Sequence, residues 1–274
     1  MAPPPPPLGQ RLLGHLRPMI LILLMAQAWS VTILTLLLKL DLRTLFTYDT
    51  LRHKAFGRMW AKYGDLMSRE MPLNTAALLA TVRGTVLDLG PGSGSQLYQF
   101  TPGQIDVAYG VEPAVDLHVL LRAAAEKRGF EGRYKVVTAG AEPESLVPAL
   151  AREGVIGEGG AEVFDEIVCV RVLCGVPRQE EVVKGLYRLL KPGGRLVVSE
   201  HVVNPWRLKE GSIVARGLQI GYHLLGWKFW AGGCCMDRDT EKSLKEAGSW
   251  SKIALERSQS WAVIPHIVGY LVKA

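Results

Sequence analysis

Cysteine is scarce in this chain. Four cysteines in 274 residues are too few for a disulfide-stabilised scaffold. Cys169 lies inside an apolar run, and Cys234 is followed directly by Cys235. We therefore expect reduced thiols in a domain that faces the cytosol.

Charge of either sign is close to balanced. Lys and Arg number 32 against 26 Asp and Glu, a formal net charge of +6. The basic residues form no stripe with interleaved aromatics and no zinc-finger, homeodomain or RNA-recognition pattern, so we expect no nucleic-acid partner. A basic surface held against anionic lipid headgroups is a more natural use of this charge.

Long uncharged runs are also rare, which excludes a polytopic membrane protein. The one such run, residues 19–38, would form a helix about 30 Å long, close to the thickness of a bilayer's hydrocarbon layer. We expect residues 1–17 to be a proline-rich lead-in and residues 18–40 to be a membrane-anchor helix. A cleaved signal peptide and a buried core helix are alternatives, but the run lacks a convincing cleavage site and a polar face. Whether the anchor spans the membrane or lies in one leaflet stays open at this point.

Residues 41–79 form an amphipathic connector. Leu51, Ala55 and Met59 recur at helical spacing, and basic side chains occupy the other faces. This pattern is typical of a helix that packs on a neighbouring domain. It is equally typical of a lid or a membrane-surface helix that places aromatic residues such as Trp60 at the headgroups.

The remaining residues, 80–274, alternate between apolar β-prone runs and helical stretches. The expected strands are residues 85–89, 107–111, 134–138, 166–172 and 195–200, with a final pair at 250–256 and 262–273. This order predicts an α/β fold in which a mainly parallel sheet is covered by helices on both faces. The final pair would form the antiparallel edge.

The first strand runs into a glycine-rich turn, residues 90–94. Glycines let a backbone approach a ligand closely, and the end of a parallel strand is where α/β folds bind ligands. The spacing G-x-G-x-G differs from the G-x-G-x-x-G of dinucleotide-binding turns. Asp88 lies two residues before Gly90 and would disfavour a phosphate, and Glu112 at the next strand end can accept the hydroxyls of a ribose. The set favours S-adenosylmethionine, a cationic nucleoside without phosphate.

Three segments resemble the class I methyltransferases. Residues 86–94 resemble their first motif, residues 110–113 their ribose-binding strand end, and residues 190–196 the turn before their fifth strand. The N-terminal anchor, the segment 233–235 and the ending 265–269 are similar to the membrane-associated methyltransferase-like family that includes alkyl thiol methyltransferases. The resemblance implies a Rossmann-like seven-stranded sheet with an antiparallel last strand. It also implies attachment to endoplasmic reticulum or lipid-droplet membranes. The need for a cytosolic cofactor favours a catalytic domain that faces the cytosol.

The resemblance also implies a set of residues that bind S-adenosylmethionine. Those expected are Asp88, Gly90, Pro91, Gly92, Ser93, Glu112, Ala141, Glu142 and Arg171. One departure concerns the adenine, because Gly140 stands where many members carry an acid. We expect this contact to fall to backbone near Ala141 or to Glu142.

The acceptor is less well determined. Aromatic residues crowd between positions 204 and 233, which suits either a packed helix or a lid over a lipophilic small molecule. A thiol acceptor ionises readily near neutral pH, whereas a hydroxyl requires a general base, for which His201 is the first candidate and His266 the second. No His/Cys pattern accompanies Cys234 and Cys235, so we expect no metal.

The expected function is S-adenosylmethionine-dependent methyl transfer to a lipophilic thiol or hydroxyl at a membrane, by a monomer. Two alternatives stay open. One is a non-catalytic methyltransferase-like scaffold at the membrane. The other is a nicotinamide oxidoreductase, which the glycine spacing disfavours.

Overall fold

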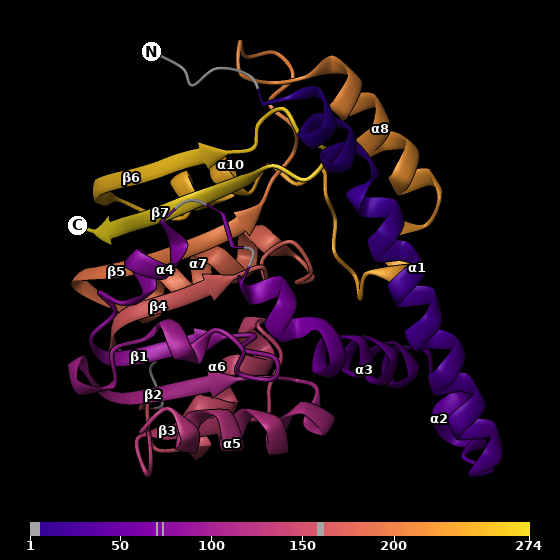
Figure 1. Ribbon diagram of the computed structural model, residues 1–274. Helices are drawn as coiled ribbons and strands as arrows, with labels where there is room; N and C mark the ends of the chain where they lie inside the picture. The colour runs from indigo at the N-terminus through magenta and orange to yellow at the C-terminus, as the bar shows by residue number, and fades with distance from the viewer. Residues whose placement is uncertain (1–5, 70, 73, 158–161) are drawn as a thin grey trace.

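A seven-stranded sheet forms the centre of the protein (Figure 1). The computed structural model describes residues 6–69, 71–72, 74–157 and 162–274. The strand order is β3-β2-β1-β4-β5-β7-β6. The strands are β1 (Gly84–Leu89), β2 (Ile105–Val111), β3 (Tyr134–Val137), β4 (Phe164–Val170), β5 (Leu190–His201), β6 (Trp250–Ser258) and β7 (His266–Lys273).

Strands β1 to β5 pair in parallel, and β7 pairs antiparallel with both β5 and β6. β7 therefore runs against the other strands of the described sheet, which confirms the expected class I methyltransferase arrangement. β5 begins at Leu190 rather than at residue 195, because Leu190 already pairs with Phe164 before a register shift. β7 begins at His266 rather than at residue 262, because Val263 and Ile264 turn away into a separate apolar cluster.

Helices cover both faces of the sheet. α6 (Pro143–Arg152), α7 (Gln179–Leu189) and α10 (Thr240–Lys245) bury one face with alternate strand residues such as Leu87. α4 (Thr75–Leu79) and α5 (His118–Lys127) bury the opposite face with residues such as Val86. Each fully buried side chain of this kind contributes about 1.5–3 kcal/mol relative to an exposed one. Short 3-10 helices occupy Leu97–Gln99, Pro102–Gln104 and Val115–Leu117.

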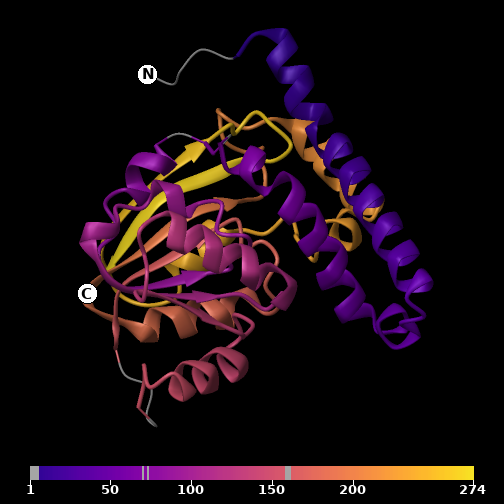
Figure 2. The same cartoon turned by 60° about the horizontal axis from the view of Figure 1, so that its bottom comes forward.

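A second layer of helices lies beyond the carboxyl ends of the parallel strands. It contains α1 (Leu8–Leu38), α2 (Leu42–Phe46), α3 (Tyr48–Arg69), α8 (Ile213–Leu224) and α9 (Trp227–Trp230). Figures 1 and 2 both show α1 running beside α3 and α8, with the sheet on the far side of α3. Asp41 accepts a hydrogen bond from Thr44 N and caps α2, so the chain reverses between α1 and α3.

Helix α1 begins at Leu8, within the segment expected to be a lead-in, and Pro18 lies inside it. The added turns are held by packing, because Gly14 lies directly against the Trp261 ring and Tyr222 donates a hydrogen bond to the His15 carbonyl at 3.0 Å. A side chain at position 14 would collide with that ring. Pro3 to Pro5 of the proline run lie outside the described residues.

α1 is long and apolar enough to cross a membrane, yet one of its sides packs on the protein. Met25, Ala28 and Trp29 on that side are buried. The opposite side exposes a row of leucines together with Ile20. α1 is therefore a docked helix with one bare apolar side.

Candidate active site

The glycine turn that follows β1 adopts a backbone that only glycine tolerates readily. Gly90, Gly92 and Gly94 have φ values of +63°, +62° and +79°. A Cβ atom on Gly90 would lie 2.6 Å from the Val172 side chain, which follows β4. The turn thus brings the ends of β1 and β4 into contact.

Glu112 comes directly after β2 and closes over the same turn. Its Oε2 accepts a hydrogen bond from Gly92 N and its Oε1 accepts one from Ala114 N, both at 2.9 Å. Burial raises the pKa of this carboxyl, and the two backbone hydrogen bonds oppose that effect. The carboxylate is therefore fixed at the end of β2, and its contact with a ribose stays a prediction.

Asp88 is buried more deeply than a residue that contacts the cofactor needs to be. It is fully buried in β1, where Oδ1 accepts from Gln96 Nε2 at 3.2 Å and Oδ2 accepts from the Tyr134 hydroxyl at 2.8 Å. Burial raises the pKa of Asp88 to about 6. Both carboxylate oxygens therefore accept hydrogen bonds from the protein itself. Contact between Asp88 and a cofactor stays a prediction.

Arg171 follows β4 and binds α3. Its guanidinium donates to Met67 O at 3.0 Å and to Ser68 Oγ at 3.2 Å. Burial lowers the pKa of Arg171 to about 10. In this structure Arg171 therefore anchors the helix that covers the site, and its predicted contact with a cofactor stays a prediction.

Trp60 of α3 lies over the glycine turn. A Cβ atom on Gly92 would collide with its indole ring, and the Arg171 guanidinium lies 5.2 Å from that ring's centroid. The buried Trp60 Nε1 has no hydrogen-bond partner among the described residues. An unpartnered donor above a glycine cradle is what a polar ligand on that turn could satisfy.

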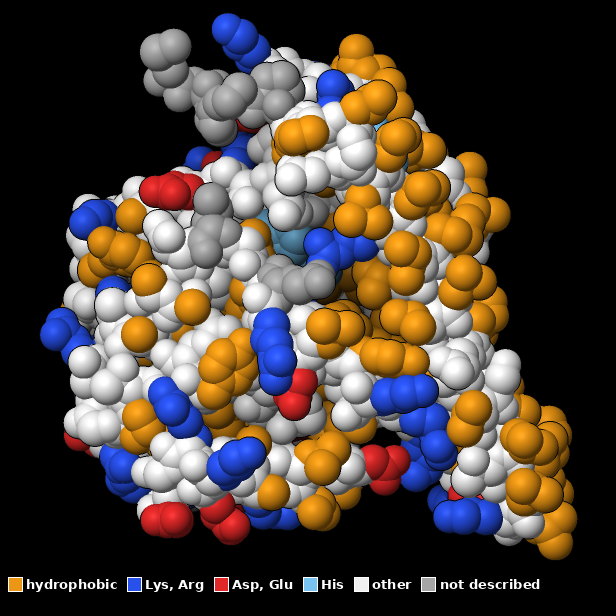
Figure 3. All heavy atoms as spheres, in the orientation of Figure 1, with side chains coloured by type: hydrophobic (Ala, Val, Ile, Leu, Met, Phe, Trp, Pro, Cys, Tyr) orange, Lys and Arg blue, Asp and Glu red, His pale blue; other side chains and the backbone are white. Residues whose placement is uncertain are grey.

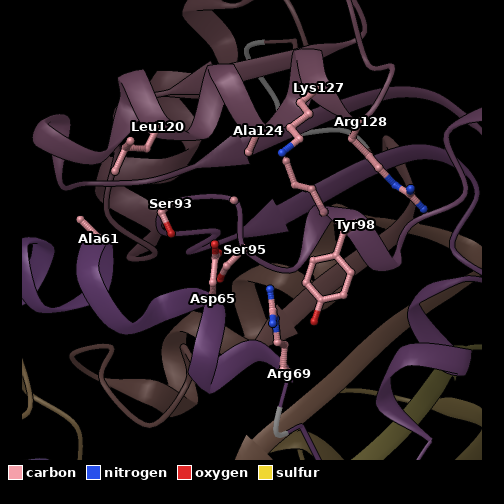
Figure 4. Close-up of a pocket in the computed structure, with 12 residues that line it drawn as sticks. Ala61, Asp65, Arg69, Ser93, Ser95, Tyr98, Leu120, Ala124, Lys127 and Arg128 are labelled. Atoms are coloured by element: carbon pink, nitrogen blue, oxygen red, sulfur yellow. The ribbon is translucent and has the colours of Figure 1, made fainter.

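A cavity of about 580 Å³ opens beside the turn, between α3 and α5 (Figure 4). Its polar lining residues are Asp65, Arg69, Ser93, Ser95, Tyr98, Lys127 and Arg128. Ser93 is the member of the predicted cofactor-binding set that lines it. Open space thus adjoins Ser93, whereas Trp60 covers Gly92.

Ala141 and Glu142 connect β3 to α6 at the same edge of the sheet. Ser145 Oγ accepts a hydrogen bond from Gly140 N, and Glu142 bends back towards Gly140. The Glu142 charge also acts on His53 of α3, raising the pKa of that imidazole against a larger lowering by burial. The predicted adenine-binding positions therefore lie just beyond the carboxyl end of β3, and their contact with adenine stays a prediction.

A cluster of sulfur and nitrogen atoms, which no sequence pattern indicated, lies at the ends of β4 and β5. Donor atoms of Cys174, His201 and Cys234 all lie within 4.8 Å of one another. His201 Nδ1 is 3.8 Å from Cys234 Sγ, and the His201 ring packs edge-on against His266 at 4.6 Å. Cys174 follows β4 and His201 ends β5, so sequence spacing alone could not join them to Cys234.

The pKa values of the Cys174 and Cys234 thiols are shifted in opposite directions. The Cys174 S–H group and His201 hold the pKa of the Cys234 thiol well below its usual value, and Cys174, as the donor, has a raised pKa. Burial lowers the pKa of His266 and raises that of Glu200, which accepts from Val172 N and Leu173 N. His201 Nδ1 already contacts Cys234. The predicted role of His201 as a general base stays a prediction.

Apolar side chains surround this cluster. Cys174 and Cys234 share one buried group with Met25 of α1, Met59 of α3 and Trp227 of α9. The group reaches from the strand ends to the helix layer. The cluster therefore lies against an apolar wall built from α1, α3 and α9.

Comparison with known proteins agrees with this arrangement. Residues 59–248 match the family model of the methyltransferase domain. The chain is 29% identical to the human thiol S-methyltransferase TMT1B over 88% of its own length and 96% of that protein. It is 30% identical to the human thiol S-methyltransferase TMT1A over 69% of its length and 70% of that protein.

A solved O-methyltransferase family protein from Burkholderia thailandensis has the same fold. The TM-score is 0.55 at 18% sequence identity, and the match covers 85% of this chain and 62% of that one. The left-handed glycine turn, the fixed Glu112 carboxylate and the unpartnered indole N–H of Trp60 fit S-adenosylmethionine as the cofactor. The family match also favours methyl transfer over the nicotinamide alternative. The chain belongs to the class I S-adenosylmethionine-dependent methyltransferases.

Proposed function

We propose that this enzyme methylates a lipophilic thiol that reaches the site from a membrane surface. The observation that carries the proposal is the position of the Cys174–His201–Cys234 cluster, which joins the strand ends to an apolar wall. The thiol S-methyltransferase names of the human relatives support a thiol over a hydroxyl acceptor.

A thiol acceptor needs little activation by the protein. S-adenosylmethionine supplies a methyl group already activated on a sulfonium. The glycine turn and Glu112 would hold the cofactor, and α3 would exclude water above it. A free thiol has a pKa of about 8.5, so a useful fraction is thiolate near neutral pH.

Exposed apolar residues of α1 and α8 form one continuous surface, which we call the α1–α8 apolar face. It includes Leu12, Leu16, Ile20, Leu23 and Leu34 of α1 and Ile213, Val214, Leu218 and Leu224 of α8. Figure 3 shows this face as a band along the right-hand side of the molecule. An apolar surface of this extent suits insertion into one leaflet, so we propose a monotopic attachment.

We propose the endoplasmic reticulum or lipid droplets as the membrane, with the catalytic domain in the cytosol. The four cysteines are free and buried, as in a reducing compartment. One copy of the chain supplies both the cofactor cradle and the apolar wall, so we propose that a monomer is active.

The test is methyl transfer from labelled S-adenosylmethionine to alkyl thiols of increasing chain length, with the matching alcohols and phenols alongside. We expect thiols to be methylated, with kcat/KM rising several-fold as the chain lengthens. Glu112→Gln should lose most of this activity, and Glu153→Gln, on an exposed helix end, is the matched control. Methylation of the alcohols but not the thiols would contradict the proposal. Cofactor binding without any transfer would favour the scaffold alternative.

A further inference from the structure

We propose that Cys174, His201 and Cys234 bind a zinc ion that keeps a fourth coordination position open. The three donor atoms lie within 4.8 Å of one another, and the nitrogen and one sulfur are 3.8 Å apart. Tetrahedral zinc, with bonds of about 2.0–2.3 Å, separates neighbouring ligand atoms by about 3.3–3.8 Å. One edge of the tetrahedron is therefore already formed.

The three ligands come from separate segments that the fold holds together. Cys174 follows β4, and its carbonyl accepts a hydrogen bond from Cys235 N at 2.8 Å, which fixes the segment carrying Cys234. His201 ends β5, and its carbonyl accepts from Thr240 Oγ1 at 3.3 Å. Preorganised ligands of this kind lose little conformational freedom when a metal binds.

The donor set and its surroundings select the metal. Two thiolates and one imidazole are soft and borderline ligands, which suit zinc in a reducing cytosol. Two thiolates would also cancel the charge of a divalent ion. A neutral site is far cheaper to bury than a charged one, and Cys174 and Cys234 are only 4% and 7% exposed.

Three protein ligands leave room for a substrate at the fourth position. This step rests on the proposed function. The acceptor thiol would release its proton to solvent and bind zinc as a thiolate. The thiolate sulfur then forms a bond to the methyl carbon, and the carbon–sulfonium bond breaks with its electron pair leaving on the cofactor sulfur. The products are a methyl thioether and S-adenosylhomocysteine.

The position of the cluster fits this use. Val172, two residues before Cys174, touches Gly90 of the cofactor turn, and β4 lies between β1 and β5 in the sheet. The zinc would thus lie beside the cradle and against the apolar wall. His201 would act as a ligand and not as a base.

The test measures zinc in the full-length protein, purified under reducing conditions and reconstituted with zinc alone. We expect about one zinc per chain. Cys174→Ser, Cys234→Ser and His201→Ala should each lower the content at least five-fold. Cys235→Ser, adjacent to a ligand, and Cys169→Ser, buried in β4, are matched controls that should keep it.

Two measurements separate metal binding from misfolding. His201→Cys should retain zinc, because a third thiolate can replace the imidazole, whereas a purely structural histidine gives no such rescue. Cobalt substitution should give a thiolate-to-cobalt absorption band that intensifies when an alkyl thiol is added. Stabilisation by S-adenosylhomocysteine would verify that each variant is folded.

A zinc-free wild type, or equal zinc loss in the Cys235→Ser variant, would overturn the proposal, as would a Cys174–Cys234 disulfide that persists in protein purified under reducing conditions. Full thiol methylation by zinc-free enzyme would overturn it while leaving the proposed function intact. Stoichiometric zinc in a protein that methylates no thiol would uphold the metal site and refute the proposed function.

Discussion

Asp88 shows how one buried carboxylate supports the cofactor turn. Its two oxygens accept hydrogen bonds from Gln96, which follows the turn, and from Tyr134 of β3. Because the folded state binds the proton of Asp88 more tightly than the unfolded state does, ionisation of Asp88 favours unfolding. The contribution of Asp88 to stability is therefore fully present below its unfolded pKa of 3.8 and is lost as the pH rises through about 6.

The Asp88→Asn variant tests this directly, because an amide cannot ionise. We expect the free energy of unfolding of the wild type, relative to the variant, to fall by up to about 3 kcal/mol between about pH 4 and pH 8. Urea unfolding curves across this range measure the difference, and Asp106→Asn, at an exposed position of β2, is the matched control. A difference that stays constant with pH would refute the assignment.

Residues within one motif are predictable, and residues joined only by the fold are not. Gly90, Gly92 and Glu112 follow from local spacing, because each is tied to the end of a strand that the sequence marks clearly. Cys174 and Cys234 meet only after β4, β5 and the loop beyond α9 have packed. Their association depends on tertiary contacts that no local pattern encodes.

Helix α3 covers the glycine turn and is held there by contacts along its length. Along its length Lys54 pairs with Asp116, Trp60 lies on the turn and Ser68 bonds to Ser95. The amphipathic pattern predicted this helix but left its partner open, because both faces carry residues able to pack. The structure shows that α3 packs across the carboxyl ends of the strands.

A ligand that binds on the turn would contact the indole of Trp60, so cofactor binding should change tryptophan fluorescence. We expect titration with S-adenosylhomocysteine to shift the emission, and Trp60→Phe to remove most of that shift. Trp250→Phe, on β6 and packed against Tyr187, is the matched control and should preserve it. An undiminished shift in Trp60→Phe would show that α3 is already clear of the cofactor.

At the scale of the whole molecule, the mainly parallel sheet followed from the alternation of strands and helices, and its reversed last strand followed from the resemblance to class I methyltransferases. The docking of α1 did not. Its composition satisfies a membrane helix equally well, and tertiary contacts such as those of Gly14 with Trp261 and of Tyr222 with His15 show that one side packs on protein.

Membrane binding should depend on the bare side of α1. We expect Leu16→Glu combined with Leu23→Glu, at positions 57% and 63% exposed, to reduce flotation with anionic liposomes at least five-fold while leaving the fold intact. Val119→Glu, at a 73% exposed position on α5, is the matched control. Unchanged flotation of the double variant would contradict the monotopic proposal.

The bond between Tyr222 and His15 spans 207 residues and has a consequence for biosynthesis. At about 5–20 residues per second, a ribosome needs roughly 10–40 seconds to make the second partner after the first. During most of that interval α1 is made but α8 and α9 are not yet present to cover it. The side of α1 that packs on α8 therefore stays uncovered during this part of synthesis, and the catalytic domain cannot complete its fold until its carboxyl-terminal half has been made.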